Sequence, residues 1–189
     1  GWDIRTPEPN HEDIRKLADM IQTAQKPLLL CGGGVVRGRA HEAFRALAEK
    51  IDAPVAITVM GGGGFPGGHP LATGMIGMHG SQASNMACDN CDLLIAVGCR
   101  FSDRVALDPE SFAAQAKIVH IDIDRAEIDK NVKTDHHIIG DAKRVLELLG
   151  DMVEPAAHTR WKEFVFSYPR RVAYEDKPGQ LTPQQVLET

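Results

Sequence analysis

The sequence has no excess of positive charge, no long apolar run and no leader-like start. Its 189 residues hold 21 Lys and Arg against 26 Asp and Glu, a formal net charge of −5. Without a basic run, binding to a nucleic-acid backbone or an anionic bilayer is disfavoured. No stretch approaches the roughly 18 apolar residues of a membrane span, and the start lacks the charge order and apolar block of a signal peptide. We expect a cytoplasmic protein without nucleic-acid or membrane partners.

The sequence signatures of a complete active centre are also missing. There is no nucleophile elbow, Walker motif, carboxylate pair or metal-ligand cluster, and the G-x-G-x-x-G fingerprint of ordinary dinucleotide-binding domains is absent. Cys88 and Cys91 form a C-x-x-C pair, but structural zinc would require further ligands at short spacing. The adjacent His136 and His137 would point to opposite faces of an extended segment. The sequence therefore predicts no metal site, and the cysteines are interpreted as incidental thiols.

What the sequence does contain is a series of short apolar runs, each of which stops at glycine or an acid. The runs occupy residues 27–31, 54–60, 93–97 and 118–121, and Gly32, Gly61, Gly98 and Asp122 follow them. In an open parallel sheet, ligands bind outside the carboxyl ends of the strands, where glycine lets a backbone approach a phosphate or a flat ring. With 43% apolar residues available for a two-sided core, we predict an α/β fold: a three-layer, Rossmann-like parallel sheet with helices on both faces.

Hydrophobic periodicity predicts alternating helices and strands. Helices are expected over 11–24, 40–50, 81–87, 110–115, 142–149 and 160–166, with helical turns over 125–131. Strands are expected over 28–31, 55–59, 93–97, 118–123 and 137–139. Ser81 is a plausible N-cap. The glycine-rich segment 61–80 is predicted to be a loop, and because long structureless connections are uncommon unless they bind something, it is a site candidate.

Two segments at strand ends offer groups for binding an anion. The run Gly32-Gly33-Gly34 suits either a phosphate cradle or a tight structural turn. The segment 98–104 brings two arginines and an acid together, either as planar donors for phosphate or carboxylate or as a salt-bridged surface loop.

Two further candidates have equally plain structural alternatives. Asp122 stands where an acid commonly holds a ribose hydroxyl, whereas Asp124 beside it suits a helix N-cap. His79 either polarises a ligand or fills space beside it. These readings stay open on the residues alone.

Two motifs connect the chain to a known family. Gly74-Met75-Ile76-Gly77-Met78-His79-Gly80 and Gly98-Cys99-Arg100-Phe101-Ser102-Asp103-Arg104-Val105 closely resemble the middle domain of acetolactate synthase, also called acetohydroxyacid synthase. The resemblance covers the whole chain. It implies a thiamine diphosphate-dependent transferase that condenses two pyruvates, or pyruvate and 2-ketobutyrate, to an acetohydroxy acid in branched-chain amino-acid biosynthesis.

The resemblance also implies a division of the chain. Residues 1–10 would be a linker from an N-terminal domain, 11–150 the central FAD-binding domain, and 151–189 a linker and the start of a C-terminal thiamine diphosphate-binding domain. Thiamine diphosphate and Mg²⁺ would be held by the other domains, so this fragment alone is expected not to be catalytic. The implied partners are 2-keto acids, a homodimer or tetramer of large subunits, and optionally a small regulatory subunit.

The resemblance further implies a set of FAD contacts, spread over the strand ends. They are Gly32, Gly33, Gly34, Thr58, Val59, Met60, Ile76, Gly77, Met78, His79, Gly98, Cys99, Arg100, Ser102, Arg104, Val105, Asp122, Ile123, Glu127, Gly140, Asp141 and Ala142. Arg104, oriented by Asp103, would also reach the substrate entrance and hold the carboxylate of the second keto acid. Ser102 replaces the family's usual second aspartate, which removes a hydroxyl acceptor. A flavin-free structural middle domain of another thiamine diphosphate enzyme is the alternative, and a free-standing NAD-binding domain is a third.

Overall fold

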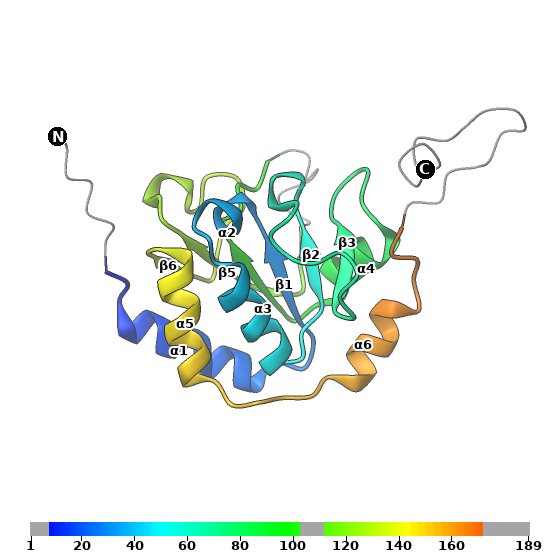
Figure 1. Cartoon of the computed structure of the whole chain (residues 1–189), viewed down its shortest axis with the longest axis horizontal. Helices are drawn as coiled ribbons and strands as arrows, with labels where there is room; N and C mark the ends of the chain where they lie inside the picture. The colour runs from blue at the N-terminus through cyan, green and yellow to red at the C-terminus, as the bar shows by residue number, and fades with distance from the viewer. Residues whose placement is uncertain (1–7, 103–111, 172–189) are drawn as a thin grey trace, which may run out of the picture.

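A computed structural model describes residues 8–102 and 112–171 of the chain, which form a six-stranded sheet between helices (Figure 1). The strands are β1 (Pro27–Cys31), β2 (Val55–Ile57), β3 (Ala72–Met75), β4 (Leu93–Val97), β5 (Lys117–Asp122) and β6 (His136–Ile139). All of them pair in parallel, in the order β3-β2-β1-β4-β5-β6. This is the strand order of doubly wound dinucleotide-binding folds. The predicted α/β, Rossmann-like fold class is confirmed.

Three of the six described helices begin after a residue whose side chain accepts a backbone N–H of the first turn. The helices are α1 (His11–Thr23), α2 (Gly33–Arg37), α3 (His41–Lys50), α4 (Gln82–Asn90), α5 (Ala142–Met152) and α6 (Thr159–Phe166), with 3-10 turns η1 (Val59–Gly61) and η2 (Arg125–Glu127). Ser81 caps α4 by accepting the Ser84 N–H, as predicted, and Asp124 caps η2 by accepting the Ala126 N–H.

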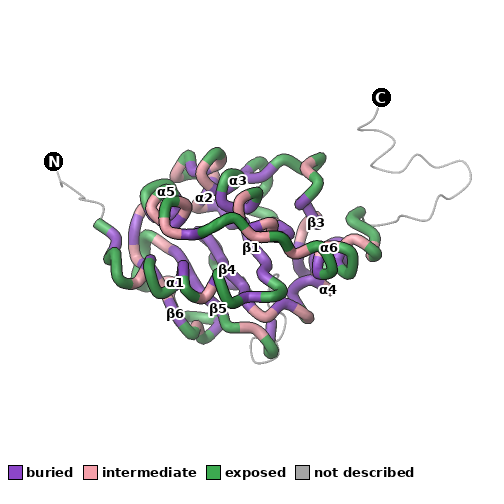
Figure 2. The backbone as a smooth tube through the Cα atoms, turned by 90° about the horizontal axis from the view of Figure 1, so that it is seen from below, coloured by how far each residue is buried: buried purple, intermediate pink, exposed green. Residues whose placement is uncertain are grey.

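Two apolar cores lie on the two faces of the sheet. One contains the buried side chains of α1, α3 and α5, and the other those of α4 and α6. Alternate residues of a strand serve opposite faces, so Ile95 of β4 joins the first core and Leu94 the second. The central strands β1 and β4 are accordingly buried at every residue, whereas the helices turn one side to solvent (Figure 2). A buried parallel sheet explains why its strands read as continuous apolar runs.

Several element predictions were wrong. The segment 61–80 is not one loop, because Ala72–Met75 forms the edge strand β3. The strand was not predicted because Gly74 and its small neighbours have low strand propensity. The glycine run is not only a turn, since α2 begins at Gly33. Strand β2 ends at Ile57 rather than at residue 59, and 112–115 forms turns instead of the expected helix. Residues 110–111 lie outside the described part of the chain.

The segment after α5 returns across the amino ends of the strands to place α6 on the second core (Figure 1). The ring nitrogens of His158 face the carbonyl oxygens of Ile51 and Ala24 at 2.8 and 3.2 Å. Trp161 Nε1 donates to the Pro27 carbonyl oxygen at 2.8 Å, so α6 is fastened to the start of β1. The predicted domain boundary at residue 150 stays a prediction. Among the described residues, no helix is long and apolar enough to cross a membrane.

Candidate functional site at the carboxyl edge of the sheet

The described members of the predicted contact set gather at one edge of the molecule, where all six strands end. In strand order they are Gly32, Gly33 and Gly34 after β1; Thr58, Val59 and Met60 after β2; Ile76, Gly77, Met78 and His79 after β3; Gly98, Cys99, Arg100 and Ser102 after β4; Asp122, Ile123 and Glu127 at and after β5; and Gly140, Asp141 and Ala142 after β6. Asp103, Arg104 and Val105 lie outside the described residues. Because parallel strands end at the same edge, the topology alone brings these groups together.

The ends of β1 and β4 close tightly on each other at the centre of this edge. The Gly32 N–H donates to the Val97 carbonyl and the Gly34 N–H to the Gly98 carbonyl, each at 2.9 Å. A Cβ atom at Gly32, Gly34 or Gly98 would collide with the facing backbone, and Gly98 has a φ of +58°. These glycines therefore serve close backbone packing, and the Gly34 N–H is already used as a donor within the protein.

The segment after β3 is braced by a residue that sequence reasoning missed. Asn85 of α4 accepts the Gly77 N–H with Oδ1 and donates to the Gly77 carbonyl with Nδ2, each at 3.0 Å. Gly77 itself has a φ of +108°, a conformation that favours glycine. The predicted helix over 81–87 already contained Asn85, but no local pattern relates it to a residue eight positions earlier. Met78 and His79 project beyond this brace and are exposed.

Large apolar side chains are exposed at this edge. Of the five large hydrophobic side chains that stand exposed on the described part of the chain, four are Val59, Met60, Met78 and Ile123, and all four belong to the predicted contact set. Met60 is 70% and Met78 62% exposed. Each of these side chains would be more stable out of water, so they are candidate contacts for a ligand. The chemistry of this edge thus fits a ligand with a flat apolar part.

Charged groups link the ends of β4 and β5. Glu127, whose side chain is only 10% exposed, faces Arg100 Nε at 3.6 Å and Lys130 Nζ at 3.3 Å. Arg100 is 71% exposed, so its guanidinium keeps free donors for a ligand while Glu127 restrains it. The alternative prediction for this segment, a salt-bridged surface loop, is partly met, because Arg100 forms an ion pair with Glu127.

Asp122 lies beside a buried histidine that sequence reasoning also missed. His120 Nε2 stands 3.4 Å from Asp122 Oδ2 without an aligned hydrogen bond, and neither ring nitrogen of His120 has a hydrogen-bond partner among the described residues. Burial alone would raise the pKa of the Asp122 carboxyl, but the His120 ring and the N–H groups of Asp124 and Ile123 together hold it below its ordinary value. Asp122 is therefore an ionised acceptor at the end of β5.

Two predicted contacts have part of their hydrogen-bonding capacity committed. Asp141 Oδ1 caps α5 by accepting the Arg144 N–H at 3.0 Å. The Thr58 hydroxyl caps η1 by accepting the Gly61 N–H at 3.1 Å. Asp141 and Thr58 therefore act as N-caps, as Asp124 does. These two caps were not identified from the sequence.

The cysteines do not have the environment of reactive thiols. All four are free and buried. Burial raises the pKa of the Cys31 and Cys88 thiols to about 12, and it also raises those of Cys91 and Cys99. A thiol held protonated is a poor nucleophile and metal ligand. Cys88 and Cys91 of the C-x-x-C pair both pack in the second core.

A hollow of about 430 Å³ lies beside the edge, between the start of α3 and the glycine-rich segment. Its lining includes His41, Arg45, Ile57, Gly63 and Phe65. None of the residues that the family resemblance implies for FAD lines it. The glycine-rich segment thus lines a hollow that lies next to the predicted contacts rather than among them, and its role as a binding site stays a prediction.

The parallel strand order defines a Rossmann-like α/β domain. The order of the strands along the sheet reverses between β1 and β4, and the candidate site lies beyond the carboxyl ends of the strands. The family described as "Thiamine pyrophosphate enzyme, central domain" matches residues 14–149. The chain belongs to this family.

Named relatives agree with that membership. The chain is 46% identical over 182 residues to a probable acetolactate synthase large subunit of Methanocaldococcus jannaschii, which covers 93% of this chain and 30% of the relative. It is 41% identical over 189 residues to the acetolactate synthase large subunit of Corynebacterium glutamicum, covering 96% of this chain and 30% of the relative. The chain thus spans about 30% of the length of these relatives.

Proposed function

We propose that the carboxyl edge of the sheet binds FAD and that the chain is the flavin-holding central domain of an acetolactate synthase large subunit. The observation that carries the proposal is the gathering of Val59, Met60, Met78 and Ile123, exposed, around strand ends that pack through glycine. FAD has a flat, largely apolar ring system, a chain of hydroxyl groups and an anionic pyrophosphate. The edge offers a counterpart to each.

The polar groups would divide the cofactor between them. Asp122, held ionised, would accept hydroxyl hydrogens, and Arg100, restrained by Glu127, would donate to anionic or carbonyl oxygens. The exposed methionines would pack on the ring system, which polarizable thioethers do well. The cofactor's role in this domain would be to complete its structure, because the family's condensation has no net redox step.

The activity of the whole enzyme belongs to the same proposal. Thiamine diphosphate with Mg²⁺, supplied by other domains, would provide the carbanion chemistry that joins pyruvate to a second pyruvate or to 2-ketobutyrate. Arg104 and Asp103 would stand at the substrate entrance. A cytoplasmic homodimer or tetramer, with or without a small regulatory subunit, is the assembly we propose.

The flavin-free scaffold is the competing function, and one residue favours it. Ser102, which is exposed, replaces an acidic acceptor, so a hydroxyl hydrogen bond is weaker or lost there.

A flavin titration decides between the two proposals. Quenching of flavin fluorescence by the 189-residue chain measures the dissociation constant, and the visible flavin band after desalting reports retention. We expect saturable quenching that Met60→Ser with Met78→Ser weakens about a hundredfold or more, because burying two side chains of this size contributes about 1.5–3 kcal/mol each. Phe164→Ser is the matched control, since Phe164 is the fifth exposed side chain and lies on α6. Absence of quenching up to the highest FAD concentration reached supports the flavin-free scaffold.

A further inference from the structure

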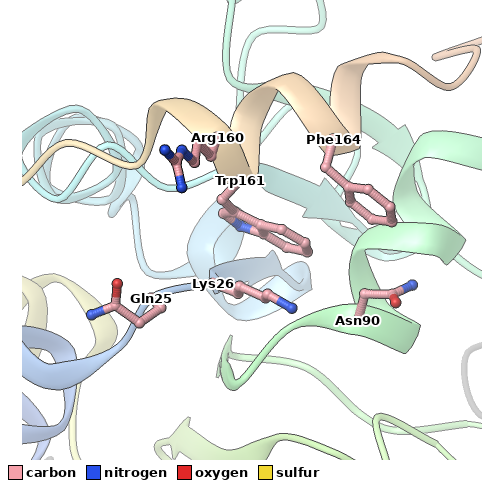
Figure 3. A pocket seen from close by; sticks show the side chains of 6 residues that line it. All are labelled: Gln25, Lys26, Asn90, Arg160, Trp161 and Phe164. Atoms are coloured by element: carbon pink, nitrogen blue, oxygen red, sulfur yellow. The ribbon is translucent and has the colours of Figure 1, made fainter.

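A second hollow lies at the opposite edge of the sheet, at the amino ends of the strands. Its volume is about 310 Å³, at the lower end of the roughly 300–1,000 Å³ typical of small-molecule sites. Segments far apart in the sequence line it: Gln25 and Lys26 before β1, Asn90 at the end of α4, and Arg160, Trp161 and Phe164 of α6 (Figure 3). Nothing in the proposed flavin site uses these residues.

The aromatic wall of this amino-edge pocket is rigid. The Trp161 and Phe164 rings stack with centroids 5.7 Å apart and an interplanar angle of 14°, and Tyr168 packs edge-on against Phe164. Trp161 is 4% exposed and its indole N–H is fixed on the Pro27 carbonyl, whereas Phe164 is 37% exposed. One ring is thus anchored in the core, and the next keeps exposed area toward solvent. A preformed wall loses little conformational entropy on binding.

The floor of the pocket is equally fixed. The carboxylate of Asp92 accepts the backbone N–H groups of Gln25 and Lys26 at 2.7 and 2.9 Å. The backbone that carries Lys26 is therefore held in place, while its ammonium extends beneath Trp161 toward the space between Phe164 and Asn90 (Figure 3). Asn90 donates through Nδ2 to the Met86 carbonyl at 2.9 Å, which leaves its side-chain oxygen as the free acceptor.

The charge of the pocket has one sign. Lys26 and Arg160 are both exposed, and no acidic side chain lines the pocket. Within the described residues neither cation forms an ion pair with a carboxylate. Arg160 lies on the side of Trp161 away from Phe164, so Lys26 is the cation next to the open ring (Figure 3). The two cations thus stand beside a stack of aromatic faces, while the nearby Asp92 carboxylate faces the backbone N–H groups of Gln25 and Lys26 rather than either cationic side chain.

We propose that this pocket binds a planar aromatic carboxylic acid, whose ring extends the Trp161–Phe164 stack and whose carboxylate accepts hydrogen bonds from Lys26. The stack selects a flat ring, because the exposed part of the Phe164 ring can take a further aromatic contact in an offset or edge-to-face arrangement. The ammonium selects an acid, because a charge-assisted hydrogen bond is stronger than a neutral one. The volume admits one such ligand. This site is independent of the flavin proposal and lies on the other edge of the sheet.

The test uses 4-fluorobenzoate as the probe and the 189-residue chain as the protein. The chain has 2 Trp, Trp2 and Trp161, so an amide NMR spectrum contains two indole N–H signals and Trp2→Phe assigns the one from Trp161. We expect the probe to shift the Trp161 signal saturably, and 4-fluorobenzamide and inorganic phosphate each to bind about tenfold or more weakly. Both comparisons remove one of the two recognition elements.

Single substitutions locate the binding. Lys26→Met and Phe164→Ala should each weaken binding of 4-fluorobenzoate about tenfold, because each removes one recognition element at an exposed position. Lys143→Met, which removes the same charge from the exposed side of α5, should leave it within twofold, roughly the scatter of a distant surface change. The dispersion of each variant's spectrum confirms that it is folded. No shift up to the solubility limit, equal binding of the neutral amide, equal binding of phosphate, or unchanged binding by Lys26→Met would overturn the proposal.

Discussion

The two edges of this sheet are built differently. At the carboxyl edge, backbone packs on backbone through Gly34 and Gly98, and the large apolar side chains stand exposed. At the amino edge, α6 covers the core with Trp161, whose indole N–H donates to the Pro27 carbonyl oxygen. The carboxyl edge leaves apolar side chains exposed to solvent, whereas the amino edge buries Trp161 between α6 and the sheet. Substitutions at the amino edge should therefore change stability without changing FAD binding, whereas substitutions at the carboxyl edge should change FAD binding.

The largest expected effect is on stability, at the amino edge. Trp161→Ala removes a buried ring and its hydrogen bond, so the free energy of unfolding should fall by about 3–5 kcal/mol. Urea denaturation followed by circular dichroism measures the change. Under conditions where the variant is folded, its FAD affinity should equal that of the parent. A variant with unchanged stability but lost flavin binding would reverse the roles of the two edges.

The next effect is at the carboxyl edge and involves both properties. Gly98→Ala places a Cβ against the Gly34 backbone at a φ of +58°, so we expect a loss of about 2–4 kcal/mol in unfolding free energy together with weaker FAD binding. Gly67→Ala is the control, because no atom lies within 4 Å of a Cβ there. It should change stability by no more than about 0.5 kcal/mol. Similar losses from both substitutions would refute the backbone-packing role of Gly98.

A smaller effect concerns pH. The folded-state pKa of Asp122 lies below the ordinary 3.8, so its ionised form stabilises the fold. That contribution is fully present above the pKa of the unfolded chain and is lost as the pH falls through the lower folded value. The stability advantage over Asp122→Asn should consequently be constant near neutral pH and shrink below about pH 4. Urea titrations of both proteins across this range provide the measurement, and a difference that stays constant to low pH would show that the carboxyl is not perturbed.

The smallest expected change in stability is at His120. Its buried ring nitrogens have no hydrogen-bond partner in the described part of the chain, so His120→Leu should change the unfolding free energy by only about 1 kcal/mol in either direction. FAD binding should nevertheless weaken, because Asp122 loses the ring that faces it at 3.4 Å. Urea denaturation measures the stability of His120→Leu and a flavin titration measures its FAD affinity, so the two effects can be separated. Unaltered FAD affinity would leave His120 with a packing role alone.

The sequence predicted the carboxyl edge better than the amino edge, for a physical reason. An apolar run that stops at glycine or aspartate marks a strand end locally, and parallel pairing then collects the ends without further information. The contact of His120 with Asp122 was also foreseeable, since residues two apart on a strand share a face. Strand β3 was missed because Gly74 and two other small residues give it little strand character.

The amino-edge pocket has no local signature at all. Lys26, Asn90 and Phe164 are each unremarkable in their own segments, and only the return of the chain after α5 brings α6 beside the start of β1. The Asn85 brace on Gly77 is hidden for the same reason, because it depends on how α4 packs against the loop after β3. Side chains whose partners are chosen by the fold cannot be predicted from spacing.

The most direct test of the account is to map where FAD binds. An amide NMR titration of the 189-residue chain with FAD reports both edges in one experiment. Binding at the carboxyl edge should produce saturable shifts at Gly33, Gly77 and Ile123 and leave the Trp161 indole signal unchanged. Shifts confined to Trp161 and its neighbours, or no shift anywhere up to the highest FAD concentration reached, would contradict FAD binding at the carboxyl edge.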